Sequence, residues 1–232
     1  MKLNKFIAQS GLCSLREAER LIHDGKVKVN GKSCVRNIEL KADEIVEVEG
    51  RTIKISSAKI YLAFNKPVGI VCTEEKDEKN NIISFINYPE RLFTIGRLDK
   101  DSEGLILLTN DGAISNRISN AENGHEKEYL VTLDKPLTNR FKIAQLEAGV
   151  KISGTITKPC KIRTVNATTF KFILTQGLNR QIRKMTESIG YKVIKLKRVR
   201  LLNIELGDLE TGKWRELSYE ELSGLHAILD KA

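Results

Sequence analysis

Three carboxylates stand at alternate positions in one short stretch of this 232-residue chain. Asp99, Asp101 and Glu103 occur in the sequence GRLDKDSEG at 96–104, directly before the apolar run Leu105–Leu108, which is typical of a buried strand. An ionised carboxylate at the edge of a pocket can act as a nucleophile or as a general base. A charged surface turn would have the same composition. The stretch is therefore a candidate catalytic site whose significance depends on the motifs around it.

Basic residues are concentrated in a second stretch, residues 179–200. The chain has 39 Lys and Arg against 30 Asp and Glu, a formal net charge of +9, and this stretch alone has eight basic residues against one acidic residue, a net +7. Such a local excess predicts a polyanionic partner. Because the basic residues at 195, 197 and 198 fall on both faces of a predicted strand, we expect at least one face to lie in water or on that partner. The basic residues are Arg180, Arg183, Lys184, Lys192, Lys195, Lys197, Arg198 and Arg200.

The sequence excludes several other kinds of site. It has no Gly-x-x-x-x-Gly-Lys loop for a nucleoside triphosphate, and its three histidines, His23, His125 and His226, stand in unrelated settings that favour surface or structural roles. The four cysteines are far apart, with no Cys-x-x-Cys pair and no histidine at metal-ligand spacing. We therefore expect reduced thiols and no metal site. The cysteines are Cys13, Cys34, Cys72 and Cys160.

The overall composition is that of a globular protein, with 41% hydrophobic and 30% charged residues. No apolar run approaches the roughly 18 residues that a membrane-spanning helix needs. The first residues, MKLNKFIAQSGL, lack the continuous apolar region of a signal peptide. We expect a cytoplasmic protein that has no contact with a membrane.

The first fifty residues have the signals of a small separate domain. Leu3, Phe6 and Ile7 have helical spacing, and a second helix is expected after the capping-box sequence Ser14–Glu17. Alternating residues at 26–32 that end in Asn-Gly predict a hairpin. Arg16 and Arg20 are four apart on the second helix and so share a face, while Lys26 and Lys28 belong to the hairpin.

This segment resembles the S4 RNA-binding domain. The motif residues follow the order of that family, with one departure at Leu15, where many members have a second arginine. The resemblance implies RNA binding. Arg16 and Arg20 could contact successive phosphates or form an ordinary solvated helix face, and the RNA contacts that we predict in this segment are Arg16, Arg20, Lys26 and Lys28. The residues that carry it are Ser14, Arg16, Glu17, Ala18, Leu21, Ile22, Gly25, Val27, Val29, Asn30 and Gly31.

The longer remainder of the chain has more strand signals than helix signals. Few of the strands alternate strictly with helices, so we predict an α+β fold with a mixed, largely antiparallel sheet. The domain division that we predict is 1–50, a linker or edge segment at 51–58, and 59–232. Strands are expected at Tyr61–Phe64, Gly69–Cys72, Leu105–Thr109, Tyr129–Leu133, Phe170–Thr175 and Tyr191–Leu196, and helices at Leu137–Leu146, Arg180–Ile189 and Glu220–Leu229.

Four motifs in this second part resemble, in their order, the motifs of RNA pseudouridine synthases. With the S4-like segment in front, they point to the RsuA family, whose members act on ribosomal RNA. The stretches at 125–131 and 176–183 are most similar to the RluF subgroup, which acts on large-subunit ribosomal RNA. The four motifs are Lys66-Pro67-Val68-Gly69, Gly96-Arg97-Leu98-Asp99 with Ser102, Gly104 and Leu105, Lys127-Glu128-Tyr129, and Gly177-Leu178-Asn179-Arg180-Gln181-Ile182-Arg183.

The resemblance implies a reaction in which uracil is detached from its ribose and rejoined through C5, with no cofactor or metal. Asp99 would be the essential carboxylate, either as a nucleophile or as the base that removes a ribose proton. Arg183 would pair with Asp99 and keep it ionised, because a guanidinium stays charged at all relevant pH values. Tyr129 would stack on the extruded base and assist proton transfer at C5.

Other residues would contact the RNA outside the reacting base. Arg97 would fill the space of the flipped base or hold a phosphate. Because extrusion costs least where a base is weakly stacked, the target uridine should lie in a loop or bulge. The partner implied is large-subunit ribosomal RNA, with no small-molecule cofactor; transfer RNA, alone or in addition, stays open as an alternative, and we expect a monomer. The phosphate contacts expected in the basic run are Arg180, Lys184, Lys195 and Lys197.

Two other classes of function remain open. A non-catalytic RNA-binding or ribosome-assembly protein would explain the charge equally well, but it would not need Asp99, Tyr129 and Arg183 together. A hydrolase could use Asp99 with Asp101 or Glu103 as an acid–base pair. Nothing in the sequence near these carboxylates supplies an aromatic platform for a sugar, so the hydrolase ranks last.

Overall fold

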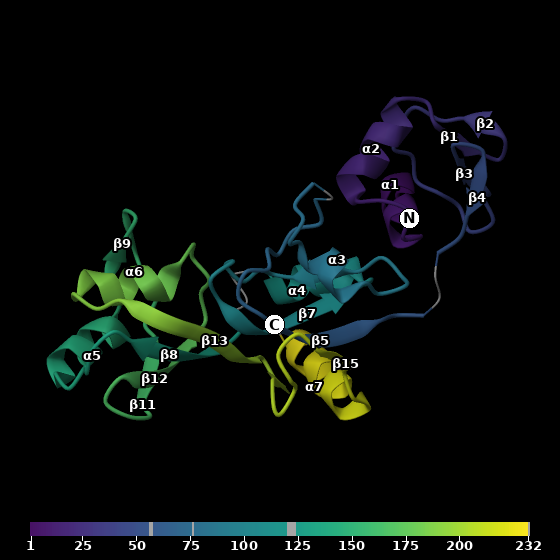
Figure 1. The fold of residues 1–232 in the computed structure, drawn as a ribbon. Helices are drawn as coiled ribbons and strands as arrows, with labels where there is room; N and C mark the ends of the chain where they lie inside the picture. Colours follow the sequence, from purple (N-terminus) through teal and green to yellow (C-terminus); the bar gives the residue numbers. More distant parts are fainter. Residues whose placement is uncertain (56–57, 76, 120–123, 232) are drawn as a thin grey trace. The chain divides into compact units, whose positions relative to one another are not determined.

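The computed structural model describes residues 1–55, 58–75, 77–119 and 124–231. Contacts between residues divide the chain into two compact units. The first contains Met1–Ile60 together with Tyr88–Phe93 and Thr109–Gly112, and the second contains most of the chain from Tyr61 onward. In Figure 1 the part of the first unit up to Ile60 is purple to blue, and the second unit runs from blue to yellow.

The first unit packs two helices against a small antiparallel sheet. The Ser14 side chain caps the second helix by accepting a hydrogen bond from the Glu17 N–H, as its sequence predicts. Asn30 and Gly31 have positive φ angles of 50° and 75°, which the tight turn of the predicted hairpin requires. The elements are α1 (Leu3–Gln9), α2 (Leu15–His23), β1 (Val27–Val29), β2 (Lys32–Ser33), β3 (Val46–Val48) and β4 (Arg51–Ile53), in the sheet order β2-β1-β3-β4.

Strand β4 lies within the segment predicted as a linker or edge segment. Residues 51–53 pair antiparallel with β3 and form the edge of the first sheet, so this sheet extends past residue 50. The strand is short and mostly exposed, which is why its sequence has no clear periodicity. The predicted linker also includes residues 56 and 57, which lie outside the described part of the chain.

The second unit is built on one nine-stranded sheet, in agreement with the predicted α+β class. Its main path runs β11-β12-β8-β13-β7-β5-β15, with β14 beside β13 and β6 beside β7. Most pairings with a defined register are antiparallel, whereas β13 and β7 are parallel. The strands are β5 (Tyr61–Lys66), β6 (Phe93–Ile95), β7 (Glu103–Thr109), β8 (Lys127–Leu133), β11 (Lys161–Thr164), β12 (Thr169–Leu174), β13 (Val193–Leu201), β14 (Ile204–Glu205) and β15 (Trp214–Glu216).

Helices cover this sheet through two apolar cores. One core joins β8, β12 and β13 to α5 and α6 through residues such as Phe172, Leu146 and Met185. The other joins β5 and β7 to α4 and α7. The helices are α3 (Ile82–Ile86), α4 (Gly112–Ser119), α5 (Arg140–Ala148), α6 (Gln181–Ser188) and α7 (Tyr219–Leu229), and β9 (Lys151–Ile152) pairs with β10 (Thr155–Ile156) in a separate hairpin.

Two predicted elements differ in the structure. Residues 69–72 do not form a strand: Gly69 has a φ of 93°, and only Val71 makes an isolated bridge, to Asn81. The helix expected from Leu137 begins at Arg140 instead, because the Asn139 side chain accepts hydrogen bonds from the backbone N–H groups of Phe141 and Lys142.

Among the described residues there is no membrane-spanning helix, no cluster of metal-ligand side chains and no disulfide bond. None of the helices is long and apolar enough to cross a membrane. Within the same residues, no three His, Cys, Asp or Glu side chains are grouped as they would be around a metal ion. All four cysteines are free thiols.

Candidate active site

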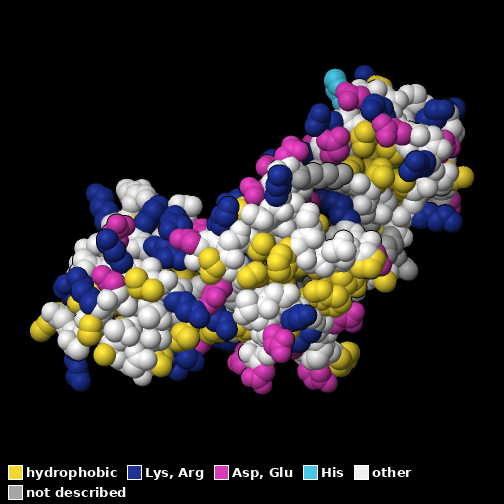
Figure 2. Space-filling view, in the orientation of Figure 1, with side chains coloured by type: hydrophobic (Ala, Val, Ile, Leu, Met, Phe, Trp, Pro, Cys, Tyr) yellow, Lys and Arg dark blue, Asp and Glu magenta, His cyan; other side chains and the backbone are white. Residues whose placement is uncertain are grey.

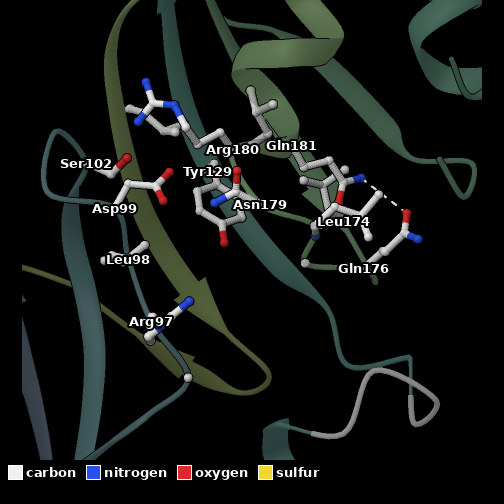
Figure 3. Close-up of a pocket in the computed structure, with 15 residues that line it drawn as sticks. Arg97, Leu98, Asp99, Ser102, Tyr129, Leu174, Gln176, Asn179, Arg180 and Gln181 are labelled. Carbon is white, nitrogen blue, oxygen red and sulfur yellow. Dashed lines mark hydrogen bonds between the residues drawn. The ribbon is translucent and has the colours of Figure 1, made fainter. Parts of the chain in front are cut away.

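A pocket of about 310 Å³ opens in the second unit where the turn at 96–102 faces the beginning of α6. Figure 3 shows the Asp99 carboxylate directed toward the side of the pocket where Tyr129 and Asn179 lie. These residues come from segments far apart in the sequence, which the sheet and α6 bring together. The pocket is lined by Gly96, Arg97, Leu98, Asp99, Ser102, Tyr129, Leu174, Gln176, Gly177, Leu178, Asn179, Arg180, Gln181, Ile182 and Leu196.

The turn that carries Asp99 is held by backbone contacts on both sides of that residue. The Leu98 N–H donates to Cys72 Sγ at 3.4 Å, and the Lys100 carbonyl accepts from the Gly69 N–H at 2.8 Å. The turn is closed by a hydrogen bond from the Ser102 N–H to the Asp99 carbonyl, 3.1 Å long. The segment 69–72 is therefore a support for the turn that carries Asp99 rather than a strand of the sheet.

Lys66 lies fully buried at the start of this support. Its Nζ donates to the carbonyls of Pro67 and Ile70 at 2.9 and 2.8 Å, which fixes the bend after β5. Burial lowers the pKa of Lys66, and the nearby acidic groups, Asp99 and Asp101 among them, oppose that effect. The lysine thus places a buried amino group next to the turn that carries the three carboxylates.

Gly104 allows β7 and β13 to approach closely just after the turn. Its φ is 102°, and a Cβ there would overlap the backbone carbonyl of Arg198 and lie 2.8 Å from its nitrogen. Arg198 itself is buried, with Nε donating to the Leu105 carbonyl at 2.6 Å and Nη2 without a hydrogen-bond partner among the described residues. Arg198 therefore lies on a buried face of β13, whereas Lys195 is exposed, in line with the prediction that at least one face of this strand lies in water or on RNA.

Tyr129 reaches the pocket from β8. In the sheet it stands opposite Phe172 of β12 and Arg198 of β13, and its side chain is half-buried against the apolar core. Its ring forms part of the pocket wall together with Leu196 and Leu174. A flat base that enters the pocket would meet this aromatic ring.

Arg183 does not pair with Asp99. Its Nε lies 3.3 Å from Asp101 Oδ2, its Nη2 donates to the Asp101 carbonyl at 2.9 Å, and its Nη1 donates to the Val193 carbonyl at 3.1 Å. Asp101 is two residues beyond Asp99, so the turn presents this second carboxylate to α6. The predicted ion pair is thus corrected: Arg183 binds the turn that carries Asp99, but through a different acid.

Arg180 completes the contact between α6 and the turn. Its two terminal nitrogens donate to the two oxygens of Asp101 at 2.9 and 2.8 Å, and its side chain also lines the pocket. The hydrogen bond to Asp101 is the main cause that raises the pKa of Arg180, and the charge of Asp99 adds to it. Arg180 therefore lies between the pocket and the Asp101 carboxylate.

Several pocket residues were not singled out from the sequence. Asn179 and Gln181 lie in the motif that identified Arg183, so their position in that motif was a usable signal. Gln181 Oε1 accepts from the Leu178 N–H at 2.9 Å, which orders the start of α6. Ser102 lines the wall beside Asp99, and its buried hydroxyl has no hydrogen-bond partner among the described residues. Ser102 also stands in the motif that contains Asp99, so its position there was a usable signal, although the sequence does not reveal its burial.

The predicted RNA contacts occur in both units. In the second unit Arg97 is exposed at the pocket, and Figure 2 shows Lys and Arg side chains gathered over the region of α6 and β9. Lys184 donates to Ser153 Oγ at 3.0 Å, and Lys195, on β13, lies 3.1 Å from Glu103. Lys197 is half-buried on the same strand.

In the first unit all four predicted contacts are exposed. Arg16 and Lys28 have no ion pair among the described residues, whereas Arg20 pairs with Glu17 at 3.0 Å and Lys26 with Glu49 at 2.8 Å. A phosphate would therefore have to compete with an acidic neighbour at two of these four positions.

This arrangement combines a pocket for a planar group with a carboxylate that has no ion pair among the described residues. Asp99 is available for nucleophilic attack or proton abstraction, whereas Asp101 is occupied by two arginines. Exposed cations around the opening suit a polyanionic substrate. The fold and the site together define an enzyme that acts on a base of a nucleic acid.

Comparison with known proteins identifies the family. The model of the RNA pseudouridylate synthase family matches residues 60–188, and that of the S4 domain matches residues 1–41. The chain belongs to the RNA pseudouridylate synthase family. It is 48% identical, over its whole length and 80% of the relative, to the dual-specificity RNA pseudouridine synthase RluF of Escherichia coli K12.

Two further matches cover nearly all of both chains. The ribosomal large subunit pseudouridine synthase B of Bacillus subtilis is 34% identical over 99% of this chain and 97% of the relative. A crystal structure of a pseudouridylate synthase matches with a TM-score of 0.71 and 31% identity, over 97% of this chain and 99% of that one. The chain is therefore an enzyme that isomerises uridine to pseudouridine in RNA, and the non-catalytic alternative is set aside.

Proposed function

We propose that this enzyme modifies a uridine of large-subunit ribosomal RNA. The support is the similarity to a synthase named for the ribosomal large subunit, together with the match to RluF over the whole chain. We further propose transfer RNA as a second substrate, on the ground that the RluF relative is described as dual-specificity. A cytoplasmic, monomeric enzyme is part of the same proposal.

Asp99 is the catalytic carboxylate in this proposal. The single observation that carries it is the place of the Asp99 side chain: it lines the pocket and has no ion pair within the described residues, whereas the neighbouring Asp101 is bound by two arginines. In the reaction the bond between N1 of uracil and C1′ breaks, the base turns, and C5 bonds to C1′. The proton of C5 is then lost and N1 gains a proton, so the formula of the nucleotide does not change.

The other pocket residues hold the base and its backbone. Tyr129 provides a ring on which the extruded uracil stacks, and its hydroxyl serves the proton transfer at C5. Arg97, exposed at the pocket, occupies the space that the base leaves or holds a phosphate. Arg183 supports the turn that carries Asp99, so its contribution to the reaction is indirect.

RNA binding is shared between two domains in this proposal. The S4-like domain extends to the end of β4, and the catalytic domain begins near residue 59. Arg16, Arg20, Lys26 and Lys28 contact phosphates from the first domain. Arg180, Lys184, Lys195 and Lys197 do so from the second.

Mapping of the product on defined RNAs tests the proposal. The purified enzyme is incubated with large-subunit ribosomal RNA, small-subunit ribosomal RNA and transfer RNA, and pseudouridines are mapped at single-nucleotide resolution. We expect one or a few modified uridines in large-subunit RNA, located in loops or bulges. Modification confined to small-subunit RNA would contradict the assignment of substrate.

A pair of variants tests the role of Asp99. Asp99→Asn should leave RNA binding nearly intact and abolish product formation, because an amide has a similar shape but is neither nucleophilic nor basic. Asp208→Asn is the control, since Asp208 is an exposed carboxylate of the same unit outside the pocket. Near-normal single-turnover rates in Asp99→Asn would place the essential carboxylate elsewhere.

A further inference from the structure

Asp101 links two parts of the catalytic unit that are about eighty positions apart in the sequence. Both of its carboxylate oxygens accept hydrogen bonds from Arg180, and Oδ2 also lies 3.3 Å from Arg183 Nε. The carbonyl of the same residue accepts from Arg183 Nη2 at 2.9 Å. One residue of the turn thus binds both arginines at the start of α6.

The two arginines differ in their freedom to leave this contact. Arg183 is anchored by three groups, including the Val193 carbonyl on β13, and only 14% of its side chain is exposed. The Arg180 guanidinium has no hydrogen bond other than those to Asp101 among the described residues, and 42% of the side chain is exposed. Competition by another anion would therefore release Arg180 and leave Arg183 in place.

The backbone of Arg180 has an unusual conformation that the contacts of its side chain help to maintain. Arg180 has a φ of 52°, a conformation unusual for a residue with a side chain, and no side-chain hydrogen bond caps α6 there. The conformation directs a guanidinium to the pocket wall and to Asp101 at once. A backbone strain of this kind persists only where surrounding contacts favour it.

We propose that Asp101 is a positioning residue with two roles, which rests on the proposed function. It fixes the turn that carries Asp99 against α6 through Arg183, and in the absence of RNA it occupies Arg180, which an RNA phosphate then takes over. The first role speeds the reaction, whereas the second weakens RNA binding because the carboxylate competes with phosphate. Removing the charge of Asp101 should therefore raise the affinity for RNA and lower the rate of the reaction.

The test measures binding and single-turnover rate on one large-subunit ribosomal RNA transcript that the wild-type enzyme modifies. Asp101→Asn should bind this RNA roughly two- to fivefold more tightly, the range expected for loss of a partly exposed ion pair. The dependence of affinity on salt should become steeper by up to about 0.9, because in the wild type the Asp101 carboxylate that Arg180 leaves takes up a cation and offsets the ion that the phosphate releases. At saturating RNA the rate should fall by about 10- to 100-fold, since small displacements of a catalytic group are costly.

Three other variants make the result specific. Asp101→Glu keeps the charge and should restore wild-type affinity with part of the rate. In an Arg180→Gln background, Asp101→Asn should no longer tighten binding, because the gain depends on a free Arg180. Asp230→Asn, which removes the exposed pair with Arg117 in the same unit, is the control and should change neither quantity.

The outcomes separate this inference from the proposed function. The positioning role would be overturned if Asp101→Asn behaves like Asp230→Asn, or if it binds RNA more tightly at an unchanged single-turnover rate. Weaker binding combined with a lower melting temperature would show a purely structural residue. If the wild-type enzyme modifies no large-subunit RNA, the proposed substrate fails first, and the comparison is made on the RNA that it does modify.

Discussion

The carboxylates at positions 99 and 101 belong to the same residue type but have different surroundings. Asp99 faces the pocket, whereas Asp101 is bound by Arg180 and Arg183. The hydrolase alternative needs Asp101 or Glu103 as a free partner for Asp99. Because Glu103 lies 3.1 Å from Lys195, both of these carboxylates already have a basic partner. At this scale the difference in function comes from what each side chain contacts.

The ion pairs of Asp101 predict a change of stability with pH. The hydrogen bond from Arg180 is the main cause that lowers the pKa of Asp101 below its ordinary 3.8. A carboxyl whose pKa is lowered on folding stabilises the protein above its unfolded pKa, and this contribution is lost as the pH falls through the lower folded value. The free energy of unfolding of wild type should therefore exceed that of Asp101→Asn at neutral pH, and the difference should shrink below pH 3.8.

The measurement is denaturant unfolding of both proteins at several pH values. The difference at neutral pH should be small, because the Asp101 side chain is 45% exposed and solvent screens the pair. A difference that is constant with pH would mean that Asp101 does not titrate through this contact.

Ser102 allows a second prediction about a single side chain. Its hydroxyl is buried in the pocket wall and unpartnered within the described residues, so Ser102→Ala removes no hydrogen bond of the folded protein. We expect the free energy of unfolding to stay equal or rise by up to about 1 kcal/mol. Because Ser102 lines the pocket beside Asp99, we propose that its hydroxyl donates to bound uridine, and loss of this one hydrogen bond should lower the single-turnover rate roughly tenfold.

Ser218 provides the opposite case as a control. Its hydroxyl accepts from the Glu221 N–H and caps α7, so Ser218→Ala should lose about 1 kcal/mol of stability without slowing the reaction. Equal losses of stability in the two serine variants would show that Ser102 has an unseen structural partner.

At the scale of elements, the sequence predicted correctly which segments meet at the pocket. It predicted less well which side chains of these segments bond to each other. The order of four motifs located Asp99, Tyr129 and the start of α6, and all three contribute to one pocket. The partner of Arg183 was wrong because two carboxylates lie two residues apart and only the three-dimensional turn selects between them. Local patterns identify elements, but they do not determine which neighbour a long side chain reaches.

Tertiary contacts that the sequence does not reveal also explain why residues 69–72 do not form the predicted strand. Its apolar residues suit a buried strand, yet its backbone groups bond to the catalytic turn and to the Lys66 ammonium instead of to a neighbouring strand. Strand β13 extends beyond the predicted strand, which ended at Leu196, because polar residues do not show the apolar pattern of a buried strand. Basic residues continue it to Leu201, and the burial of Arg198 could not be read from the residue type.

Gly104 leads to a prediction about the junction of β7 and β13. Gly104→Ala would place a methyl group against the backbone of Arg198, at a φ of 102° that alanine does not tolerate. Because backbone cannot move aside as a flexible side chain does, we expect a loss of about 2–4 kcal/mol in stability and a strong loss of activity. Denaturant unfolding and product formation measure the two effects.

The control is a glycine in an ordinary conformation. Gly112 lies at the start of α4, and a Cβ there would be 3.9 Å from Phe93. Gly112→Ala should therefore change stability by well under about 1 kcal/mol. If Gly104→Ala were equally mild, the close approach of β7 to β13 would not be a constraint on the sequence.

The whole molecule divides its basic residues between two units that have different tasks in the proposed function. Arg16 and Lys28 are exposed in the first unit and have no ion pair among the described residues. Lys195 and Lys197 lie on β13, close to the catalytic turn in the fold. Both pairs are expected to contribute charge to RNA binding, while the reaction depends on the pocket alone.

Paired substitutions in the full chain test this division. Arg16→Gln with Lys28→Gln should weaken RNA binding and reduce the salt slope by roughly 0.7 to 0.9 per lost contact, with an unchanged rate at saturation. Lys195→Gln with Lys197→Gln should do the same. A lower rate at saturating RNA in the first pair would mean that the S4-like unit takes part in assembling the active site.

The parallel pairing of β7 with β13 also determines when the active site can form during synthesis. The chain between Gly104 and Arg198 must be made before the two strands meet, which takes about 5–20 s at ordinary elongation rates. Until then the segment that carries Asp99 leaves the ribosome with one strand edge unpaired. The enzyme therefore gains its activity late, when β13 closes the sheet, and its half-made chains pass through a stage in which they are exposed to aggregation.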